Sequence, residues 1–468
     1  MPRTPLSIET VRSQVVGVDQ PVPLLDGAWR TYINLDNAAS TPALQPVADR
    51  VNAFLSWYAS VHRGAGFKSQ LSTWAYEQAH AQVLRFFEAD PGEYITIFSK
   101  NATESINKLA HRLALEQGDV VLISLLEHHS NDLPWRGKAQ IHRIDVTPEG
   151  LLDEDHFDHL LRRYAGRVRL VAVSGASNVT GCCTPIYRLA QKAHAAGAQI
   201  LVDAAQLAPH RKVEMGRLDD PCHLDYLAIS GHKMYAPFGT GALVGRRDTF
   251  LDGDPDLVGG GTVTLVTTDS VYWGPLPEKE EAGSPNVLGA VALAEALRCL
   301  QEIGMDNIAE HEAALTAHAL ERLRAIDPPL TLYGDCDPAC CACRVGVVSF
   351  LVPGVDHHKV AAILGYEEGI GVRSGCFCAQ PYLFRLLGLS AQEIAGLRAA
   401  VTMGEESLLP GLVRISLGCY NSTAEIDAAA DALARIARGD YRGRYLQATD
   451  GSYHPEGHSI DWSRYLEG

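Results

Sequence analysis

The sequence lacks the features that direct a chain to a membrane or to nucleic acid. No stretch approaches the roughly 18 consecutive apolar residues of a membrane span, and residues 1–6 do not open an apolar run of signal-peptide length. The 40 basic residues are outnumbered by 56 acidic ones, the net charge is −16, and no block of Lys or Arg is present to bind a phosphate backbone. We therefore expect a cytoplasmic protein that has neither a membrane nor a nucleic acid as its partner.

Internal repeats and low-complexity tracts are also missing. With 46% hydrophobic and 21% charged residues, the composition excludes disordered and fibrous proteins. At 468 residues the chain is too long for one simple core, so we expect two domains. Its eleven cysteines are an odd number that cannot all pair, and the cytosol keeps cysteines reduced. We interpret them as thiols.

Short apolar runs alternate with helical patterns from Tyr94 to about Arg247. The expected strands are residues 95–98, 120–123, 170–173, 200–202, 226–229 and 242–244. This alternation predicts an α/β fold with a mostly parallel sheet covered by helices. Beyond Gly289 a long helix is expected over 290–303, continuing after Met305 to about residue 325, with strands at 345–350 and 414–417. These elements predict a smaller α+β domain.

Two polar residues follow apolar strands in a way that indicates a cofactor. Lys233 lies in a tight turn of small residues, and a desolvated lysine forms Schiff bases with carbonyls such as pyridoxal phosphate (PLP). Asp203 ends an apolar strand, and PLP enzymes place an acid against the pyridine nitrogen. The alternative interpretations are a surface lysine for Lys233 and a helix N-cap for Asp203. Because ligands gather at the carboxyl ends of parallel strands, we favour a shared site.

Three segments resemble one known family. They are the Ser-Gly-His-Lys turn at 230–233, the Leu-Val-Asp-Ala-Ala-Gln run at 201–206, and the Arg-Ser-Gly-Cys-Phe-Cys-Ala-Gln-Pro segment at 373–381. Together they resemble the class V aminotransferase superfamily and, more narrowly, its group II cysteine desulfurases and selenocysteine lyases. The resemblance runs from about Leu35 to about Asp427.

The resemblance implies a fold-type I PLP-dependent transferase that is a homodimer with active sites at the subunit interface. It implies a large PLP-binding α/β domain over 30–290. Residues 1–29 and 291–440 would form the small α+β domain, and 441–468 would be a C-terminal extension.

The resemblance also assigns residues to the cofactor. His128 would stack on the pyridine ring and relay protons, Asp203 would pair with its nitrogen, and Lys233 would carry the Schiff base. The remaining candidates are Gln206 at the phenolic oxygen and Thr103, Ser230, His232 and, from the partner subunit's copy, Ser284 at the phosphate. Thr103 has a second interpretation as a helix N-cap. No metal is expected.

Cys378 decides the expected reaction type. In the family this position holds the nucleophile that takes sulfur from a cysteine–PLP adduct, leaves a protein persulfide and releases alanine. Its other interpretation is a small buried apolar residue. The substrate carboxylate would be held by Asn178, Arg373 and Arg414, since arginine binds carboxylates with two parallel hydrogen bonds.

The sequence departs from the family pattern near this cysteine. Cys376-Phe377 stands where the family has two histidines, and Arg414 lies 36 residues after Cys378, with an apparent helical insert between them. Both features resemble the desulfurase domain of molybdenum-cofactor sulfurases. Cys376 either exchanges sulfur with Cys378 or is an idle substitution. The insert either covers the site or docks a sulfur acceptor.

A second group of cysteines, Cys336, Cys340, Cys341 and Cys343, has two equal interpretations, a metal or redox site and a loop rich in cysteine by chance. We expect a PLP-dependent cysteine desulfurase that converts L-cysteine to L-alanine and passes the sulfur to an acceptor protein. An aminotransferase, epimerase or carbon–sulfur lyase of the same fold is the first alternative. A non-catalytic sulfur-relay or docking protein is the second. The acceptor, and the choice between cysteine and selenocysteine, stay open.

Overall fold

A computed structural model describes residues 5–334, 337, 341 and 343–465. In this part of the chain the main sheet has seven strands, and β10 runs antiparallel to both its neighbours while the other neighbouring pairs are parallel. Their order across the sheet is β4 (Tyr94–Ser99), β10 (Gly241–Arg246), β9 (Tyr226–Ser230), β8 (Gln199–Asp203), β7 (Val168–Ser174), β5 (Val120–Ser124) and β6 (Gln140–Ile144).

The strands expected from the sequence are present, and one further strand joins them. The central strands are apolar on both faces and almost wholly buried, which is why the sequence marks them as continuous runs. The further strand, β6, reads Gln-Ile-His-Arg-Ile and is mostly half-exposed. It forms an edge of the sheet, so its polar residues interrupt the apolar pattern.

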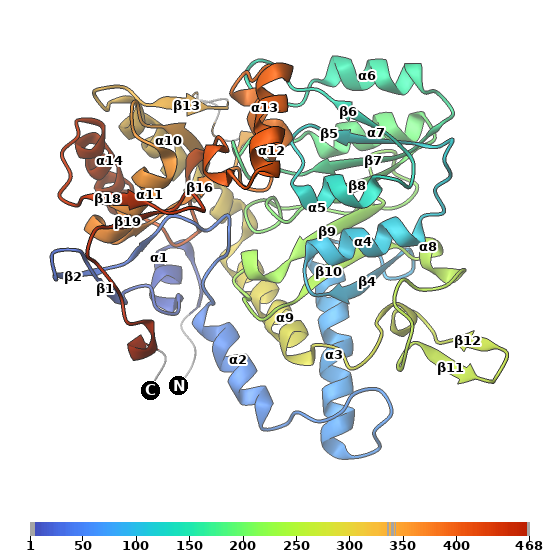
Figure 1. Cartoon of the computed structure of the whole chain (residues 1–468). Coiled ribbons are helices and arrows are strands. Elements are labelled where there is room, and N and C mark those ends of the chain that lie inside the picture. The colour runs from blue at the N-terminus through green and yellow to red at the C-terminus, as the bar shows by residue number, and fades with distance from the viewer. Residues whose placement is uncertain (1–4, 335–336, 338–340, 342, 466–468) are drawn as a thin grey trace.

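Helices cover both faces of this sheet (Figure 1). The helices between its strands are α4 (Ala102–Arg112), α5 (His129–Asp132), α6 (Glu154–Arg163) and α7 (Ile186–Ala195), and α8 (Asp248–Leu251) follows β10. A second group is formed by α2 (Gln45–Leu55) and α3 (Phe67–Phe86), which both pack on α9 (Val287–Ile303). The helix pattern expected from residue 290 breaks at Gly304, whose φ of 91° separates α9 from α10 (Met305–Arg324).

The C-terminal elements lie beside the large sheet (Figure 1). An antiparallel sheet runs in the order β13 (Thr331–Tyr333), β14 (Val347–Leu351), β17 (Leu412–Ser416) and β16 (Arg373–Gly375). It packs with α10, α11 (His357–Glu368) and α14 (Thr423–Ala437). The expected insert holds α12 (Gln380–Leu386) and α13 (Ala391–Thr402).

Short elements complete the described chain. They are α1 (Ile8–Val11), the hairpins β1 (Pro21–Pro23) with β2 (Trp29–Thr31), β11 (Val263–Val266) with β12 (Val271–Trp273), and β18 (Tyr445–Gln447) with β19 (Tyr453–Pro455), and the parallel pair β3 (Ile33–Asn34) with β15 (Ile370–Gly371). The last pair ties the N-terminal segment to the C-terminal elements. The proposed division at residues 29, 290 and 440 stays a prediction.

None of the helices in these residues combines the length and the apolar character that crossing a bilayer requires.

A buried carboxylate joins the large sheet to the C-terminal elements. Glu312 of α10 is 2% exposed and accepts hydrogen bonds from His210 Nδ1 at 2.7 Å and from the Gly346 backbone N–H at 2.8 Å. Arg211 forms an ion pair with its other oxygen. Burial alone would raise the pKa of Glu312, but His210 and Arg211 reverse this and the net shift is downward.

Replacing Glu312 with alanine should therefore destabilise the fold strongly. It leaves the buried His210 and the half-buried Arg211 without the carboxylate that they contact, and breaking a buried pair costs about 3–5 kcal/mol. The urea midpoint of unfolding should fall accordingly. Glu310→Ala, an exposed position on the same helix, is the matched control and should change stability little. Equal effects of the two variants would contradict this role for Glu312.

Candidate active site

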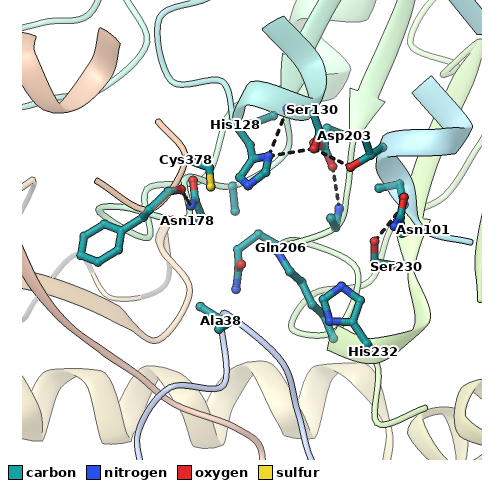
Figure 2. A pocket seen from close by; sticks show the side chains of 18 of the residues that line it. Ala38, Asn101, His128, Ser130, Asn178, Asp203, Gln206, Ser230, His232 and Cys378 are labelled. Carbon is teal, nitrogen blue, oxygen red and sulfur yellow. Dashed lines mark hydrogen bonds between the residues drawn. The ribbon is translucent and has the colours of Figure 1, made fainter. Parts of the chain in front are cut away.

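The carboxyl ends of the central strands face a cavity of about 240 Å³ (Figure 2). The side chains predicted from the sequence, apart from Ser284, line this cavity. They are Thr103, His128, Asn178, Asp203, Gln206, Ser230, His232, Lys233, Arg373, Cys378 and Arg414. Parallel strands bring their following turns to one edge of the sheet, so segments far apart in sequence meet here.

Lys233 and Asp203 form the buried base of the cavity. Lys233 ends the short turn 231–233 after β9, and Asp203 ends the neighbouring strand β8. Burial, reinforced by Arg414, lowers the pKa of Lys233 to about 8, although Asp203 acts against this shift. Burial raises the pKa of Asp203, and its carboxylate accepts a hydrogen bond from the Ala205 N–H at 3.0 Å. A substantial share of the amine is therefore neutral near pH 8.

The start of α4 forms one side of the cavity. Asn101 is the N-cap, because its side chain accepts the Glu104 N–H at 3.0 Å, so the alternative interpretation of Thr103 as the N-cap is wrong. Ser230 Oγ accepts the Ala102 N–H at 2.9 Å, and Thr103 Oγ1 lies 2.7 Å from Ser130 Oγ. A helix N-terminus flanked by hydroxyl groups favours an anion.

His128 covers the cavity from the turn after β5 (Figure 2). Its Nδ1 accepts the Ser130 N–H at 3.1 Å and lies 2.9 Å from Ser130 Oγ. Nδ1 is thus unprotonated and the proton of the neutral ring is on Nε2. Burial, with Lys233 and His129, lowers the pKa of His128 to about 3, so the ring is neutral where Lys233 titrates. Sequence reasoning missed Ser130, although its hydroxyl two residues after the histidine was a readable signal.

Cys378 lies in a strained turn that two hydrogen bonds hold. Phe377 and Cys378 have φ values of 53° and 54°, in the left-handed region that glycine normally occupies. The Phe377 carbonyl accepts Asn178 Nδ2–H at 2.7 Å, and the Cys378 carbonyl accepts the His129 N–H at 2.8 Å. The Cys378 side chain is exposed and lines the cavity. The second interpretation, a buried apolar residue, is therefore wrong.

The two predicted arginines differ in their surroundings. Arg414 is buried and donates to Asp36 at 2.9 Å and to the Asn178 carbonyl at 3.0 Å. Its Cζ lies 4.7 Å from the centre of the Phe377 ring. Arg373 is exposed and lies 3.8 Å from Asp36. Sequence reasoning missed Asp36, whose signal is an acidic residue directly after the apolar pair Ile33 and Leu35. The Asn178 amide holds the cysteine turn, a contact that the expected carboxylate role did not include.

Two buried polar atoms at the cavity have no hydrogen-bond partner within the described residues. They are Oε1 of Gln206 and Nε of Arg414. Buried polar atoms in proteins are normally paired, so these two fit a bound polar molecule.

Some predicted features lie elsewhere. Ser284 lines a separate hollow together with Arg63 and Gly261. In the second cysteine group, Cys341 is buried and Cys343 is exposed, whereas Cys336 and Cys340 lie outside the described residues. No part of this group enters the cavity around Lys233, as far as the described residues extend.

A family model for aminotransferase class-V matches residues 33–429. The chain belongs to this family. A cysteine desulfurase of Haloferax volcanii is 35% identical over 445 residues, which cover 92% of this chain and 96% of the relative. The similarity covers nearly the whole of both chains and so extends beyond the motifs of the cavity.

Solved structures of cysteine desulfurases also match. The apo cysteine desulfurase of Thermococcus onnurineus NA1 superposes with a TM-score of 0.79 and 31% identity, over 93% of this chain and 99% of that one. The cysteine desulfurase CsdA of Escherichia coli, in an S-sulfonic acid form, superposes with a TM-score of 0.76 and 28% identity. This match covers 94% of this chain and 100% of that one. The expected fold-type I architecture is confirmed.

Removing the Asn178 amide should loosen the cysteine turn. Asn178→Ala leaves the Phe377 carbonyl without its donor, a loss of about 1–3 kcal/mol for a buried group, so local opening should become on the order of tenfold more frequent. Hydrogen exchange of the peptide spanning residues 375–382 measures this opening.

Asn107→Ala is the control, because the exposed Asn107 donates only to the Thr103 carbonyl of its own helix. Unchanged exchange in Asn178→Ala would show that the turn does not depend on this hydrogen bond.

Proposed function

We propose that this chain is a PLP-dependent cysteine desulfurase that moves the sulfur of L-cysteine onto Cys378 and releases L-alanine. The observation that carries the proposal is the exposed Cys378 thiol in the same cavity as the buried amine of Lys233. An aminotransferase or epimerase has no use for a thiol there. The names of the Haloferax and Thermococcus relatives support the same reaction.

The residues around the cavity fit PLP. The Lys233 amine would bind it covalently, and the buried Asp203 carboxylate would face its pyridine nitrogen. The Gln206 amide, whose Oε1 has no partner within the described residues, suits the phenolic oxygen, which can donate or accept. The phosphate would bind at the start of α4, beside Thr103, Ser230 and His232, because a helix N-terminus favours an anion.

When bound, PLP withdraws electrons from the Cα of the amino acid and so weakens the bonds on which this reaction depends. Asp203 would hold a proton at the pyridine nitrogen, which would strengthen that withdrawal. Lys233 in its neutral form can take the Cα proton, because its lowered pKa makes the free amine available near neutral pH. His128 is neutral and holds its proton at Nε2, where it can cover the ring without placing a second cation in the site.

Cys378 performs the sulfur transfer. Its thiolate attacks the substrate sulfur, a new S–S bond forms, and the substrate C–S bond breaks. The substrate carbon gains a proton, so the protein thiol and L-cysteine become a protein persulfide and L-alanine. The left-handed turn at Phe377 and Cys378 presents the thiol to the cavity, which supplies the orientation that the attack needs.

The substrate carboxylate would lie between Arg414 and Arg373. Nε of Arg414 is buried and unpartnered within the described residues, and Arg373 is exposed beside it on the adjacent strand. Asp36 contacts both guanidinium groups. A carboxylate entering this site would therefore share Arg414 with Asp36.

We extend the proposal to a homodimer in the cytoplasm that passes sulfur to an acceptor protein. Ser284 lies outside the cavity of its own chain, as a residue serving the partner's site would. The β11–β12 hairpin also exposes the apolar residues Leu265, Val266 and Tyr272, which would suit a subunit interface. A reducing compartment suits the thiol chemistry of Cys378.

The activity test compares the protein with Cys378→Ala. With PLP, L-cysteine and a reductant, the protein should form alanine and sulfide in equal amounts, and the variant should lose at least about a hundredfold in rate because the nucleophile is gone. Alanine and sulfide are measured separately.

Cys343→Ala removes another exposed thiol and serves as the control. If Cys378→Ala still releases sulfide at the full rate, the protein is instead a carbon–sulfur lyase. If PLP binds but no alanine forms, it is an aminotransferase or epimerase.

The lowered pKa of Lys233 predicts how cofactor loading depends on pH. Only the neutral amine reacts, so the rate of covalent PLP attachment to the cofactor-free protein should rise about tenfold per pH unit below about pH 7.5 and level off above about pH 8.5. Borohydride trapping followed by peptide mapping of Lys233 measures the rate. A rate that still rises at about pH 10, as for an ordinary lysine, would contradict the burial effect.

A further inference from the structure

A second thiol shares the turn that presents Cys378. The Cys376 carbonyl accepts the Ala379 N–H at 3.0 Å, which closes a four-residue turn over 376–379. Its two central residues, Phe377 and Cys378, both have positive φ, as type I′ turns require. Cys376 is therefore the first residue of the turn and Cys378 the third. The reaction proposed above makes no use of Cys376.

The turn brings the Cα atoms of the two cysteines close together. Helical backbone of either hand places Cα atoms two residues apart at roughly 5.4 Å, from its rise and radius. This separation falls inside the range of roughly 4.4–6.8 Å that disulfides span. Side chains two residues apart on helical backbone do not face each other, so the two sulfurs can bond only when the turn moves.

The two side chains differ in depth. Cys378 is exposed and lines the cavity, whereas Cys376 is half-buried and packs against the large hydrophobic core. A persulfide on Cys378 would extend its terminal sulfur into the cavity. Cys376 approaches from the protein side, so the inner sulfur, Sγ of Cys378, is the one nearer to it.

We propose that Cys376 is a resolving thiol for the persulfide on Cys378; this role rests on the proposed function. The sulfur of Cys376 attacks Sγ of Cys378, the Cys376–Cys378 disulfide forms, and the terminal S–S bond of the persulfide breaks. The leaving sulfur departs with the electron pair of that bond and takes up the proton of Cys376, as hydrogen sulfide. The persulfide itself is the oxidant, so no other co-reactant is required.

The surroundings of Cys376 suit a thiol that waits for the persulfide. Burial raises the pKa of Cys376, which keeps the resting thiol protonated and protects it from outside oxidants. The Cys378 backbone N–H and Arg373 act in the opposite direction and favour the thiolate. The disulfide would then block Cys378 until an external thiol or dithiol reduces it, so sulfur not collected by an acceptor would leave as sulfide.

A single turnover without reductant tests this role. The PLP-loaded protein receives one equivalent of L-cysteine per site under anaerobic conditions, so that no excess thiol reduces the persulfide. Alanine and sulfide are measured, and the acid-quenched protein is alkylated and mapped without reduction. Cys376→Ala and Cys376→Ser are compared with the unaltered protein and with Cys343→Ala, which removes an exposed thiol elsewhere.

The unaltered protein and Cys343→Ala should release about one alanine and one sulfide per site and carry the Cys376–Cys378 disulfide. Both Cys376 variants should still form alanine but release at least about tenfold less sulfide, and they should keep a persulfide on Cys378. A stable persulfide in the unaltered protein, or equal sulfide release from the Cys376 variants, would overturn the role of Cys376. Absence of alanine from every protein would instead overturn the proposed function, and the role of Cys376 with it.

Discussion

Two hydrogen bonds to consecutive carbonyl groups hold the turn on which the whole site depends. Left-handed backbone at Phe377 and Cys378 costs of order 1–3 kcal/mol per residue. The donors are the Asn178 side chain and the His129 backbone, which lie in turns that follow two neighbouring strands of the large sheet. Together the two hydrogen bonds stabilise the turn by a free energy that offsets much of this backbone cost. The thiol therefore reaches the cavity only because the edge of the sheet and the C-terminal elements are packed against each other.

The same packing places several charged side chains in the cavity, where little water can reach them. Asp203 and Arg414 are buried, Lys233 is half-buried, and each shifts the titration of another. Burial lowers the pKa of Arg414, and the ion pair with Asp36 counteracts that shift. Asp36 thus keeps the guanidinium charged and oriented before any substrate enters. An unpaired buried cation would cost several kcal/mol, so a partner of this kind is required.

The sequence predicted what depends on strand order and missed what depends on packing. Buried parallel strands appear as apolar runs, and the polar residues after them, such as Asp203 and Lys233, necessarily meet at one edge. The edge strand β6 was missed because its half-exposed face carries polar residues. Asp36 and the amide contact of Asn178 were missed because each needs a partner from a distant segment. A local pattern can mark Asp36 as a candidate, but it does not identify the distant partner of either residue.

The geometry of the cysteine turn also bears on the fate of the sulfur. A thiol held two residues away acts as an intramolecular reagent, whose effective concentration exceeds that of any freely diffusing partner. In the proposed reaction, an acceptor protein would therefore have to collect the terminal sulfur before Cys376 reaches Sγ. Because Asn178 and His129 hold the turn, they limit how freely the two cysteines approach each other. The rigidity that presents Cys378 to its substrate thereby also lengthens the time in which an acceptor can bind.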